Sequence, residues 1–205
     1  MNNTRAVVTY LSKYISGNTL DFGAGSAKYR NIIAPHTSKY TTFDVIGGEN
    51  IDIVGDAHKP PFIDKTFDTV ISTQMLEHVE RPWVIVGEIK RILKPGGICI
   101  ITAPFMIPYH ADPHDFFRYT KEGLGSLFKN EKFEILESGS YGKAPSVLAE
   151  MIHFSFFSHY KILTGRKNLW RSRVMRILKA LGYKLDTLVS GKVIYANVYV
   201  VARIK

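Results

Sequence analysis

Two glycines and two carboxylates near the start of the chain have the spacing of a ligand-binding loop. Asp21, Gly23 and Gly25 lie in the run Leu-Asp-Phe-Gly-Ala-Gly-Ser, and glycines at this spacing allow a tight turn and a close approach of the backbone to a ligand. Asp44 follows 19 residues after Gly25, which suits a carboxylate that accepts hydrogen bonds from ribose hydroxyls. Lys28 stands where a dinucleotide-binding loop has its third glycine, and an acidic residue beside the loop disfavours a diphosphate. The pattern favours a cationic ligand with an amino-acid end over a nicotinamide cofactor.

A second group of reactive side chains lies between residues 104 and 120. Histidine, aspartate, arginine and tyrosine gather there: Tyr109, His110, Asp112, His114, Asp115 and Arg118. Such side chains can supply a general base, a carboxylate that orients it and a contact for an anion. Asp115 and Arg118 can equally pair with each other and brace the loop, and both interpretations stay open.

Alternating strands and helices are expected to position these two groups. Apolar runs bounded by turn residues predict strands over residues 18–22, 40–45, 51–54, 67–72, 98–103, 132–137 and 193–204. Helical spacing of apolar residues predicts helices over residues 4–16, 27–33, 82–93 and 121–128. This α/β alternation is typical of a doubly wound, mostly parallel sheet, here with seven strands. Such sheets bind ligands beyond the carboxyl ends of their strands, where both groups of side chains lie.

The order of motifs along the chain resembles that of the class I S-adenosylmethionine-dependent methyltransferases, and within them the methyltransferase type 11 family. The resemblance rests on the glycine loop at residues 20–26, on Gly55-Asp56-Ala57, on Gln74-Met75-Leu76-Glu77-His78 and on Lys94-Pro95-Gly96-Gly97. It implies a Rossmann-like fold, methyl transfer as the activity and S-adenosylmethionine as the cofactor.

The resemblance also implies which residues hold the cofactor: Asp21, Gly23, Gly25, Asp44, Asp56, Ala57 and Gln74. In that assignment the loop at residues 21–25 surrounds the methionine part, and Asp44 holds the ribose hydroxyls. Asp56 accepts a hydrogen bond from the adenine amino group beside the Ala57 backbone. Gln74 lines the mouth that cofactor and substrate share.

Methyl transfer makes few demands on the acceptor side, because the protein mainly aligns the two reactants and excludes water. A base is needed only where the acceptor loses a proton, as a hydroxyl does. We expect His110 to be that base, with His114 and Asp115 as the second choice. Tyr109 and Arg118 are expected to contact the substrate.

Two further sets of residues in this region have other candidate roles. His110, Asp112 and His114 alternate along the loop and include suitable metal ligands, but the resembling family needs no metal and none is expected. Glu77 and His78 match the family pattern. They stay open between a role in the site and a simple tie between the loop and the next helix.

The positive charge of the chain is concentrated in one segment. The 205 residues include 27 Lys+Arg and 18 Asp+Glu, a net charge of +9, with an ordinary globular share of 45% hydrophobic residues. Residues 151–185 contain basic side chains and no Asp or Glu, and apolar residues recur there at helical spacing. We therefore expect a basic helical insertion over residues 141–192 within a single domain of residues 1–205.

Three explanations fit this insertion. Basic and aromatic residues without acids are typical of an interfacial helix on an anionic membrane, whereas a lid helix packed on the domain fits equally well. Nucleic-acid binding is disfavoured because no recognised motif accompanies the charge.

The sequence thus predicts methyl transfer from S-adenosylmethionine to a small-molecule, glycan or lipid-linked acceptor, with oxygen as the favoured target. A non-catalytic S-adenosylmethionine-binding or scaffold protein that works through the basic insertion is the alternative. No secretory leader and no long uncharged apolar run occur, and a lone Cys99 in an apolar run predicts a buried, inert thiol. We expect a cytoplasmic protein, with peripheral contact at the inner face of a membrane as an extension; the oligomeric state is left open.

Overall fold

The structure is a computed structural model that describes residues 1–111, 113–155, 169–189 and 193–205. Within these residues one sheet has the strand order β3-β2-β1-β4-β5-β7-β6. Its strands are β1 (Asn18–Phe22), β2 (Lys39–Asp44), β3 (Ile53–Val54), β4 (Phe67–Thr73), β5 (Leu93–Pro104), β6 (Glu134–Lys143) and β7 (Tyr195–Arg203). Strand β7 is antiparallel to both of its neighbours, and the other pairs are parallel. The predicted doubly wound, mostly parallel, seven-stranded sheet is confirmed.

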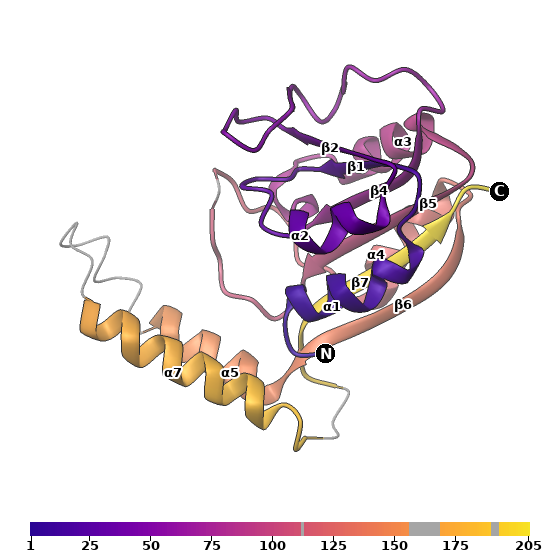
Figure 1. The fold of residues 1–205 in the computed structure, drawn as a ribbon. Coiled ribbons are helices and arrows are strands. Elements are labelled where there is room, and N and C mark those ends of the chain that lie inside the picture. Colours follow the sequence, from indigo (N-terminus) through magenta and orange to yellow (C-terminus); the bar gives the residue numbers. More distant parts are fainter. Residues whose placement is uncertain (112, 156–168, 190–192) are drawn as a thin grey trace.

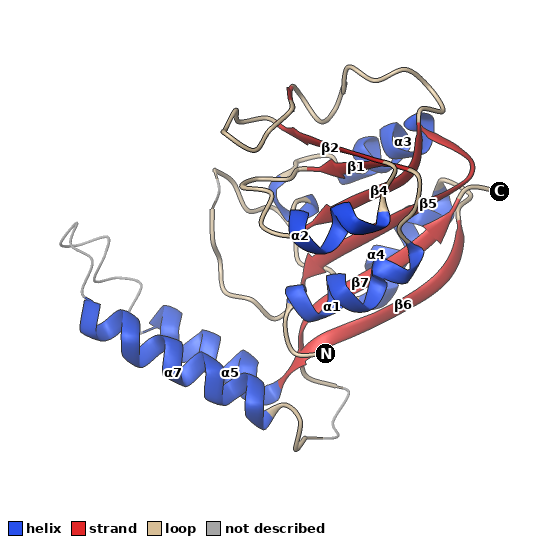
Figure 2. Ribbon diagram, viewed as in Figure 1, coloured by secondary structure: helices blue, strands red, loops and turns tan. Residues whose placement is uncertain are grey.

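Helices cover both faces of the sheet, as Figures 1 and 2 show. They are α1 (Thr4–Leu11), α2 (Arg30–Ile33), α3 (Pro82–Ile92) and α4 (Lys121–Asn130), with short turns η1 (Ser12–Tyr14), η2 (Ala34–His36) and η3 (Leu76–His78). Helices α1 and α2 lie on one face, and α3 and α4 lie on the other. Thr120 caps α4, as predicted, because its hydroxyl accepts the N–H of Gly123 at 2.9 Å.

Alternate residues of the central strands fill two apolar cores, one on each face. Val70 and Ile101 pack in the core that includes α3 and α4, whereas Ile71 and Ile100 pack in the core that includes α1 and α2. Successive strand residues point to opposite faces, so a strand covered on both faces is an unbroken apolar run. Cys99 lies in the first core, where burial raises the pKa of its thiol, and the predicted buried cysteine is confirmed.

Two predicted helices are shorter in the structure. The helix expected over residues 27–33 is reduced to α2, because Ala27 has a φ of +52°, a left-handed backbone that interrupts helical geometry. The helix expected over residues 4–16 ends at Leu11 and continues as the tighter turn η1.

Two strands are several residues longer than predicted. Strand β5 begins at Leu93, which already pairs with Phe67, whereas the predicted strand begins at residue 98. Strand β6 continues to Lys143 because its outer end still pairs with β7. Residues 141–143 were expected to open the insertion and belong to this strand instead.

Helices α5 (Ala144–His153) and α7 (Leu169–Leu185) form an arm that projects from the domain beyond β6 (Figure 1). Gly182 marks their close approach, since a Cβ there would lie 3.1 Å from the Cβ of Ala149. Buried Asp186 anchors the arm, because its carboxylate accepts the N–H groups of Lys143 at 2.9 Å and Ser146 at 3.1 Å. The predicted helical insertion between the sixth and seventh strands is confirmed.

Part of the basic segment lies outside the described residues, including Phe156, Phe157, Lys161, Arg166 and Lys167. Among the helices of the described ranges, none combines the length and apolarity needed to cross a bilayer.

Candidate functional site

Two glycines shape the backbone that follows β1. Gly23 and Gly25 have φ values of +75° and +56°, which glycine adopts without the steric penalty of a side chain. The N–H groups of Gly23 and Ala24 donate to the carbonyl of Phe43 at 2.9 and 3.0 Å and so join the loop to β2. A Cβ on Gly23 would lie 2.5 Å from Cγ of Met75. The loop backbone is therefore packed closely between the ends of β2 and β4.

Asp44, at the end of β2, holds the tip of this loop. Its Oδ2 accepts the N–H of Gly25 at 2.7 Å, and its Oδ1 accepts the N–H of Ile46 at 3.0 Å. A carboxylate offers about four lone-pair positions. Asp44 can therefore keep the loop in place and still accept hydrogen bonds from ligand hydroxyls.

A cavity of about 640 Å³ opens at the carboxyl ends of these strands, a size typical of small-molecule sites. Six of the seven residues predicted to hold the cofactor line it: Gly23, Gly25, Asp44, Asp56, Ala57 and Gln74. Apolar side chains form much of the remaining wall, among them Phe43, Val45, Ile46, Met75, Val79 and Phe116. The cavity thus combines a broad apolar surface with a few polar groups.

Asp21 is the predicted cofactor residue that does not line the cavity. It is 2% exposed, and its carboxylate accepts the Tyr40 hydroxyl at 2.5 Å. Burial raises the pKa of Asp21 to about 6, although the Tyr40 hydrogen bond acts in the opposite direction. Asp21 thus supports the loop from behind.

The chain after β3 contributes a second carboxylate. Asp56 Oδ1 accepts the N–H of His58 at 2.8 Å and lies 3.0 Å from Nδ1 of the same residue. These hydrogen bonds lower the pKa of Asp56. An ionised carboxylate at the cavity wall is suited to accept a hydrogen bond from an amino group.

Gln74 turns the chain from β4 into the cavity wall. Its φ of +55° is uncommon outside glycine and is the kind of backbone strain found at ligand sites. Its side-chain Nε2 donates to Oγ1 of Thr102 at 3.1 Å and to the Tyr141 hydroxyl at 3.2 Å. These bonds fix Gln74 between the sheet and the cavity.

The segment after β5 is tied to turn η3, which follows β4. The N–H of Phe116 donates to the carbonyl of Glu77 at 2.7 Å, and Nδ1 of His78 lies 2.6 Å from the carbonyl oxygen of His114. Because β4 and β5 are adjacent and parallel, the residues that follow them meet at one edge of the sheet.

The predicted catalytic residues occupy different places. His114 lines the cavity, whereas His110 is not among its lining residues and faces Glu77. Asp115, 1% exposed at its side chain, forms a bidentate ion pair with Arg118 and accepts the N–H of His110 at 2.8 Å. Arg118 also donates to the carbonyls of Ile107, Pro108 and Phe117. Asp115 and Arg118 therefore have the geometry of the loop brace.

A neighbouring hollow of about 350 Å³ holds the predicted substrate contacts. Tyr109, 72% exposed, lines it together with Asp115 and Arg118. Phe116 borders both this hollow and the larger cavity. Asp112, considered as a metal ligand in the sequence, lies outside the described residues.

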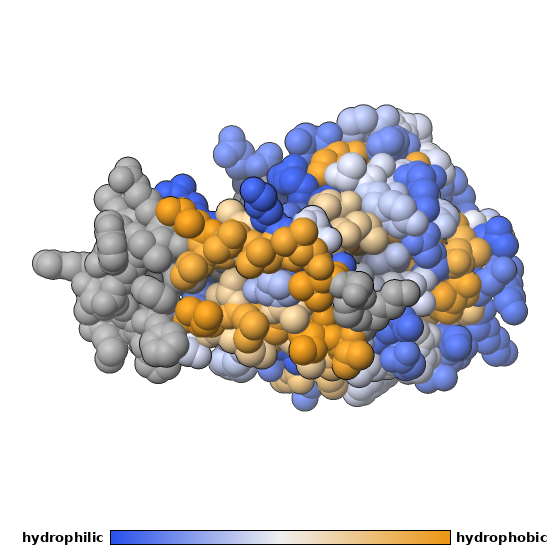
Figure 3. All heavy atoms as spheres, turned by 90° about the horizontal axis from the view of Figure 1, so that it is seen from below, coloured by the Kyte–Doolittle hydropathy of each residue, from blue (hydrophilic) through white to orange (hydrophobic). Residues whose placement is uncertain are grey.

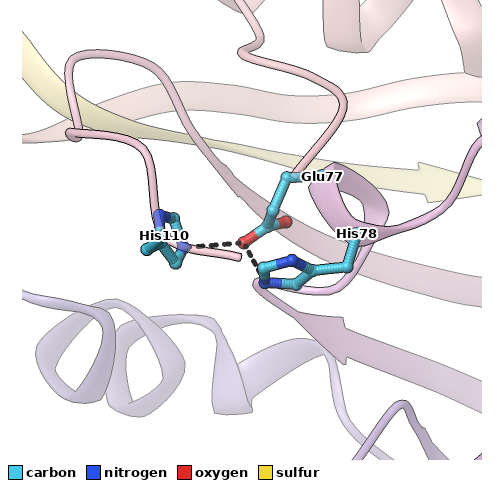
Figure 4. A group of neighbouring side chains, drawn as sticks. All are labelled: Glu77, His78 and His110. Atoms are coloured by element: carbon cyan, nitrogen blue, oxygen red, sulfur yellow. Dashed lines mark ion pairs between the residues drawn. The ribbon is translucent and has the colours of Figure 1, made fainter. Parts of the chain in front are cut away.

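Glu77 is the residue of this region for which the sequence left two roles open. It is fully buried, and neither carboxylate oxygen has a hydrogen-bond partner in the described part of the chain. Burial raises the pKa of Glu77 to about 8. Figure 4 shows its carboxylate between the rings of His78 and His110. In the sequence, Glu77 is recognisable only as a carboxylate in the motif that follows the fourth predicted strand. The sequence alone did not show that His110 would face it.

Comparison with known sequences identifies one domain type. The family model described as a methyltransferase domain matches residues 20–101. The ubiquinone/menaquinone biosynthesis C-methyltransferase UbiE of Desulfotalea psychrophila is 34% identical over 123 residues, which cover 56% of this chain and 50% of that protein. The chain spans about half the length of the curated relatives it matches.

Comparison with solved structures covers nearly the whole chain. The [4+2]-cyclase SpnF has a TM-score of 0.67 at 18% identity, over 98% of this chain and 80% of that one. Phosphoethanolamine N-methyltransferase 2 of Haemonchus contortus, solved in complex with S-adenosyl-L-methionine, has a TM-score of 0.62 at 16% identity, over 98% of this chain and 52% of that one. At these identities the likeness concerns the fold.

Proposed function

We propose that the chain, whose residues 20–101 match the methyltransferase-domain model, is a class I S-adenosylmethionine-dependent methyltransferase and transfers a methyl group to a small molecule that carries a hydroxyl group. The observation that carries the proposal is the cavity of about 640 Å³, because residues from four strand ends that match the family's cofactor motifs meet on its wall. Solved neighbours include a [4+2]-cyclase, so the fold alone does not imply methyl transfer.

The groups that line the cavity suit S-adenosylmethionine. The loop at Gly23 and Gly25 offers backbone without side chains, as the methionine part requires. Asp44 offers acceptor positions for ribose hydroxyls, and Asp56 offers an ionised acceptor for the adenine amino group. Apolar side chains such as Met75 supply a surface for the adenine ring.

Bound S-adenosylmethionine supplies an activated methyl group, whose bond to sulfur breaks as an acceptor lone pair bonds to the methyl carbon and the sulfur leaves as a neutral thioether. The residues of this chain align the reactants and exclude water. We assign to His114 the role of the general base that removes the proton of an acceptor hydroxyl. His114 lines the cavity, whereas His110 faces Glu77. This choice reverses the order predicted from sequence.

The acceptor and its methylated atom belong to this proposal. Oxygen is our preferred target, since a hydroxyl acceptor gives the histidine beside the cavity a proton to remove. The relative UbiE is a C-methyltransferase by name, so carbon is the competing target. Proton and carbon NMR of the purified product would distinguish an O-methyl from a C-methyl group.

Binding and turnover test the proposal separately. We expect S-adenosylhomocysteine to bind the purified protein in calorimetry, and methyl-labelled S-adenosylmethionine to label a compound in a fractionated metabolite extract. Binding without labelling of any fraction would favour the non-catalytic binding protein. Binding of a nicotinamide cofactor in place of S-adenosylhomocysteine would overturn the proposal.

We further propose that the arm of α5 and α7 contacts an anionic membrane surface from the cytoplasmic side, which would bring a lipid-linked acceptor within reach. The arm exposes apolar side chains at helical spacing: Leu148, Met151 and Ile152 on α5, and Ile177, Leu181 and Leu185 on α7. Figure 3 shows a band of apolar surface on this part of the molecule, and we call the six side chains the apolar stripe. Five of the six stripe residues lie within residues 151–185, which carry basic side chains and no acid. An apolar face with surrounding positive charge is the pattern of an interfacial helix.

A further inference from the structure

Three side chains with electron-pair donors converge beside the cavity, and one of them, His78, lines it. Oε1 of Glu77 lies 3.6 Å from Nε2 of His78 and 4.0 Å from Nε2 of His110. One ligand atom from each residue lies within 4.8 Å of the other two, and Figure 4 shows the three side chains facing one another. Two ligands held about 2.1 Å from a tetrahedral ion are about 3.4 Å apart. The two separations from Oε1 exceed this value by about 0.2 and 0.6 Å, so the three side chains would have to move closer together around an ion.

Both histidines are oriented by backbone carbonyls. Nδ1 of His78 lies 2.6 Å from the carbonyl oxygen of His114, and Nδ1 of His110 lies 3.0 Å from that of Pro108. A carbonyl oxygen only accepts, so these contacts favour a proton on each Nδ1. The guanidinium of Arg118 lies farther from His110 Nδ1, at 3.4 Å. In the neutral rings each Nε2 then presents a lone pair toward Glu77, an arrangement typical of histidines that ligate metals.

Glu77 supplies the third lone pair. Its surroundings also indicate independently that the carboxylate lacks a binding partner. Its side chain is fully buried, and both of its oxygens lack a hydrogen-bond partner among the described residues. A buried polar group without a partner is costly. A cation between Glu77 and the two rings would offset that cost.

We propose that Glu77, His78 and His110 bind a divalent transition-metal ion, such as Zn²⁺, beside the methyl-donor cavity. Two imidazole nitrogens and a carboxylate form a ligand set that suits Zn²⁺ and related first-row ions. The site differs from the alternating His110, Asp112 and His114 set considered in the sequence. It also departs from the expectation that no metal is used.

The position of the ion defines what it does. His78 lines the cavity, and the side chains of His78 and His110 are 17% and 32% exposed, so an ion held by them would border the cavity. Three protein ligands with an open position are the pattern of a catalytic site. An acceptor hydroxyl bound there is more acidic and is held in one orientation. This use of the ion rests on the proposed function, whereas metal binding itself does not.

Metal binding by the full chain tests the proposal without any acceptor. We expect the metal-free protein to bind one Zn²⁺ per chain in calorimetry, and Co²⁺ to give the visible absorption of a protein-bound ion. His110→Ala, His78→Ala and Glu77→Gln should each weaken Zn²⁺ binding at least about 100-fold, since each removes or neutralises a direct ligand. His36→Ala, a histidine of turn η2 outside the cluster, should bind as the wild type does.

Two results would overturn the metal site. One is a wild-type protein that binds neither Zn²⁺ nor Co²⁺. Glu77 would then be protonated, and no ion would lie between it and the two histidines. The other is unchanged binding in both His78→Ala and His110→Ala, which together keep the test valid if Glu77→Gln fails to fold. Calorimetry with S-adenosylhomocysteine runs beside each variant. Lost metal binding with retained S-adenosylhomocysteine binding separates failure of the metal site from failure of the proposed function.

Discussion

The carboxylate of Asp44 accepts the backbone N–H of Gly25 at 2.7 Å, so the end of β2 fixes the loop that follows β1. A side chain at a strand end thereby has two roles, because it shapes the glycine loop and faces the cavity that the loop lines. Removal of this carboxylate is expected to affect ligand binding through both roles.

Asp44→Ala should weaken S-adenosylhomocysteine binding about 10- to 150-fold, which corresponds to the loss of about 1.5–3 kcal/mol for a hydrogen bond to a charged group. Calorimetry measures the change. Glu49→Ala removes a carboxylate from an exposed position between β2 and β3 and is the matched control. Equal affinity of wild type and a folded Asp44→Ala variant would exclude Asp44 from the cofactor site.

His114→Ala should lower kcat by about 10²- to 10⁴-fold once an acceptor is known, because a general base contributes a factor of this size. Its affinity for S-adenosylhomocysteine and for Zn²⁺ should stay at the wild-type value. His110→Ala should instead lose Zn²⁺ binding. Full turnover in His114→Ala would return the role of base to another group.

The strands that hold the cofactor side could be predicted because their signals are local. Strand β1 covers the predicted residues 18–22, and β4 extends the predicted segment by one residue to Thr73. Both are largely buried, with four of the five residues of β1 and five of the seven residues of β4 inside. The helix expected over residues 27–33 is largely absent because Ala27 adopts its left-handed backbone in the context of the folded loop, and helix propensity does not report such a context.

The acceptor side was less predictable because it depends on contacts between distant residues. The Asp115–Arg118 pair is separated by three positions, and the sequence could therefore offer it as an alternative. Glu77 and His110 meet only because the chain segments after β4 and β5 lie side by side. No periodicity within either segment contains that information, and the cluster with His78 emerged only from the structure.

Asp21 should give the stability of the protein a measurable pH dependence. Its pKa is about 6 in the folded chain against an ordinary value of 3.8, so the folded state binds the proton more tightly than the unfolded state. The contribution of Asp21 to stability is therefore full below about pH 4 and is lost as pH rises through 6. A shift of this size corresponds to about 3 kcal/mol.

Urea unfolding between pH 4 and 7.5 tests this expectation. The free energy of unfolding of Asp21→Asn should rise relative to wild type as pH increases and then level off above about pH 6. Tyr40→Phe removes the hydrogen bond that lowers the Asp21 pKa. In this variant the pH range over which the free energy of unfolding falls should therefore move to higher pH. A pH-independent difference between wild type and Asp21→Asn would contradict the raised pKa.

The apolar stripe on the arm gives the last prediction, which concerns binding to vesicles. Ile177 and Leu181 are 66% and 49% exposed, and apolar side chains gain free energy when they leave water. Each Lys or Arg near an anionic surface adds about 1 kcal/mol. Wild type should therefore cosediment with phosphatidylglycerol-containing vesicles more strongly than with neutral ones, and salt should weaken that preference.

The double variant Ile177→Ser/Leu181→Ser should reduce binding to anionic vesicles at least about tenfold, because it removes apolar area from the stripe and leaves the charge unchanged. Ile63→Ser is the matched control, since Ile63 is 82% exposed on the globular body. Equal sedimentation of the double variant and wild type would show that the stripe does not contact lipid. A wild type that ignores vesicles but forms a dimer, which the double variant abolishes, would instead identify the stripe as an interface between two copies of the chain.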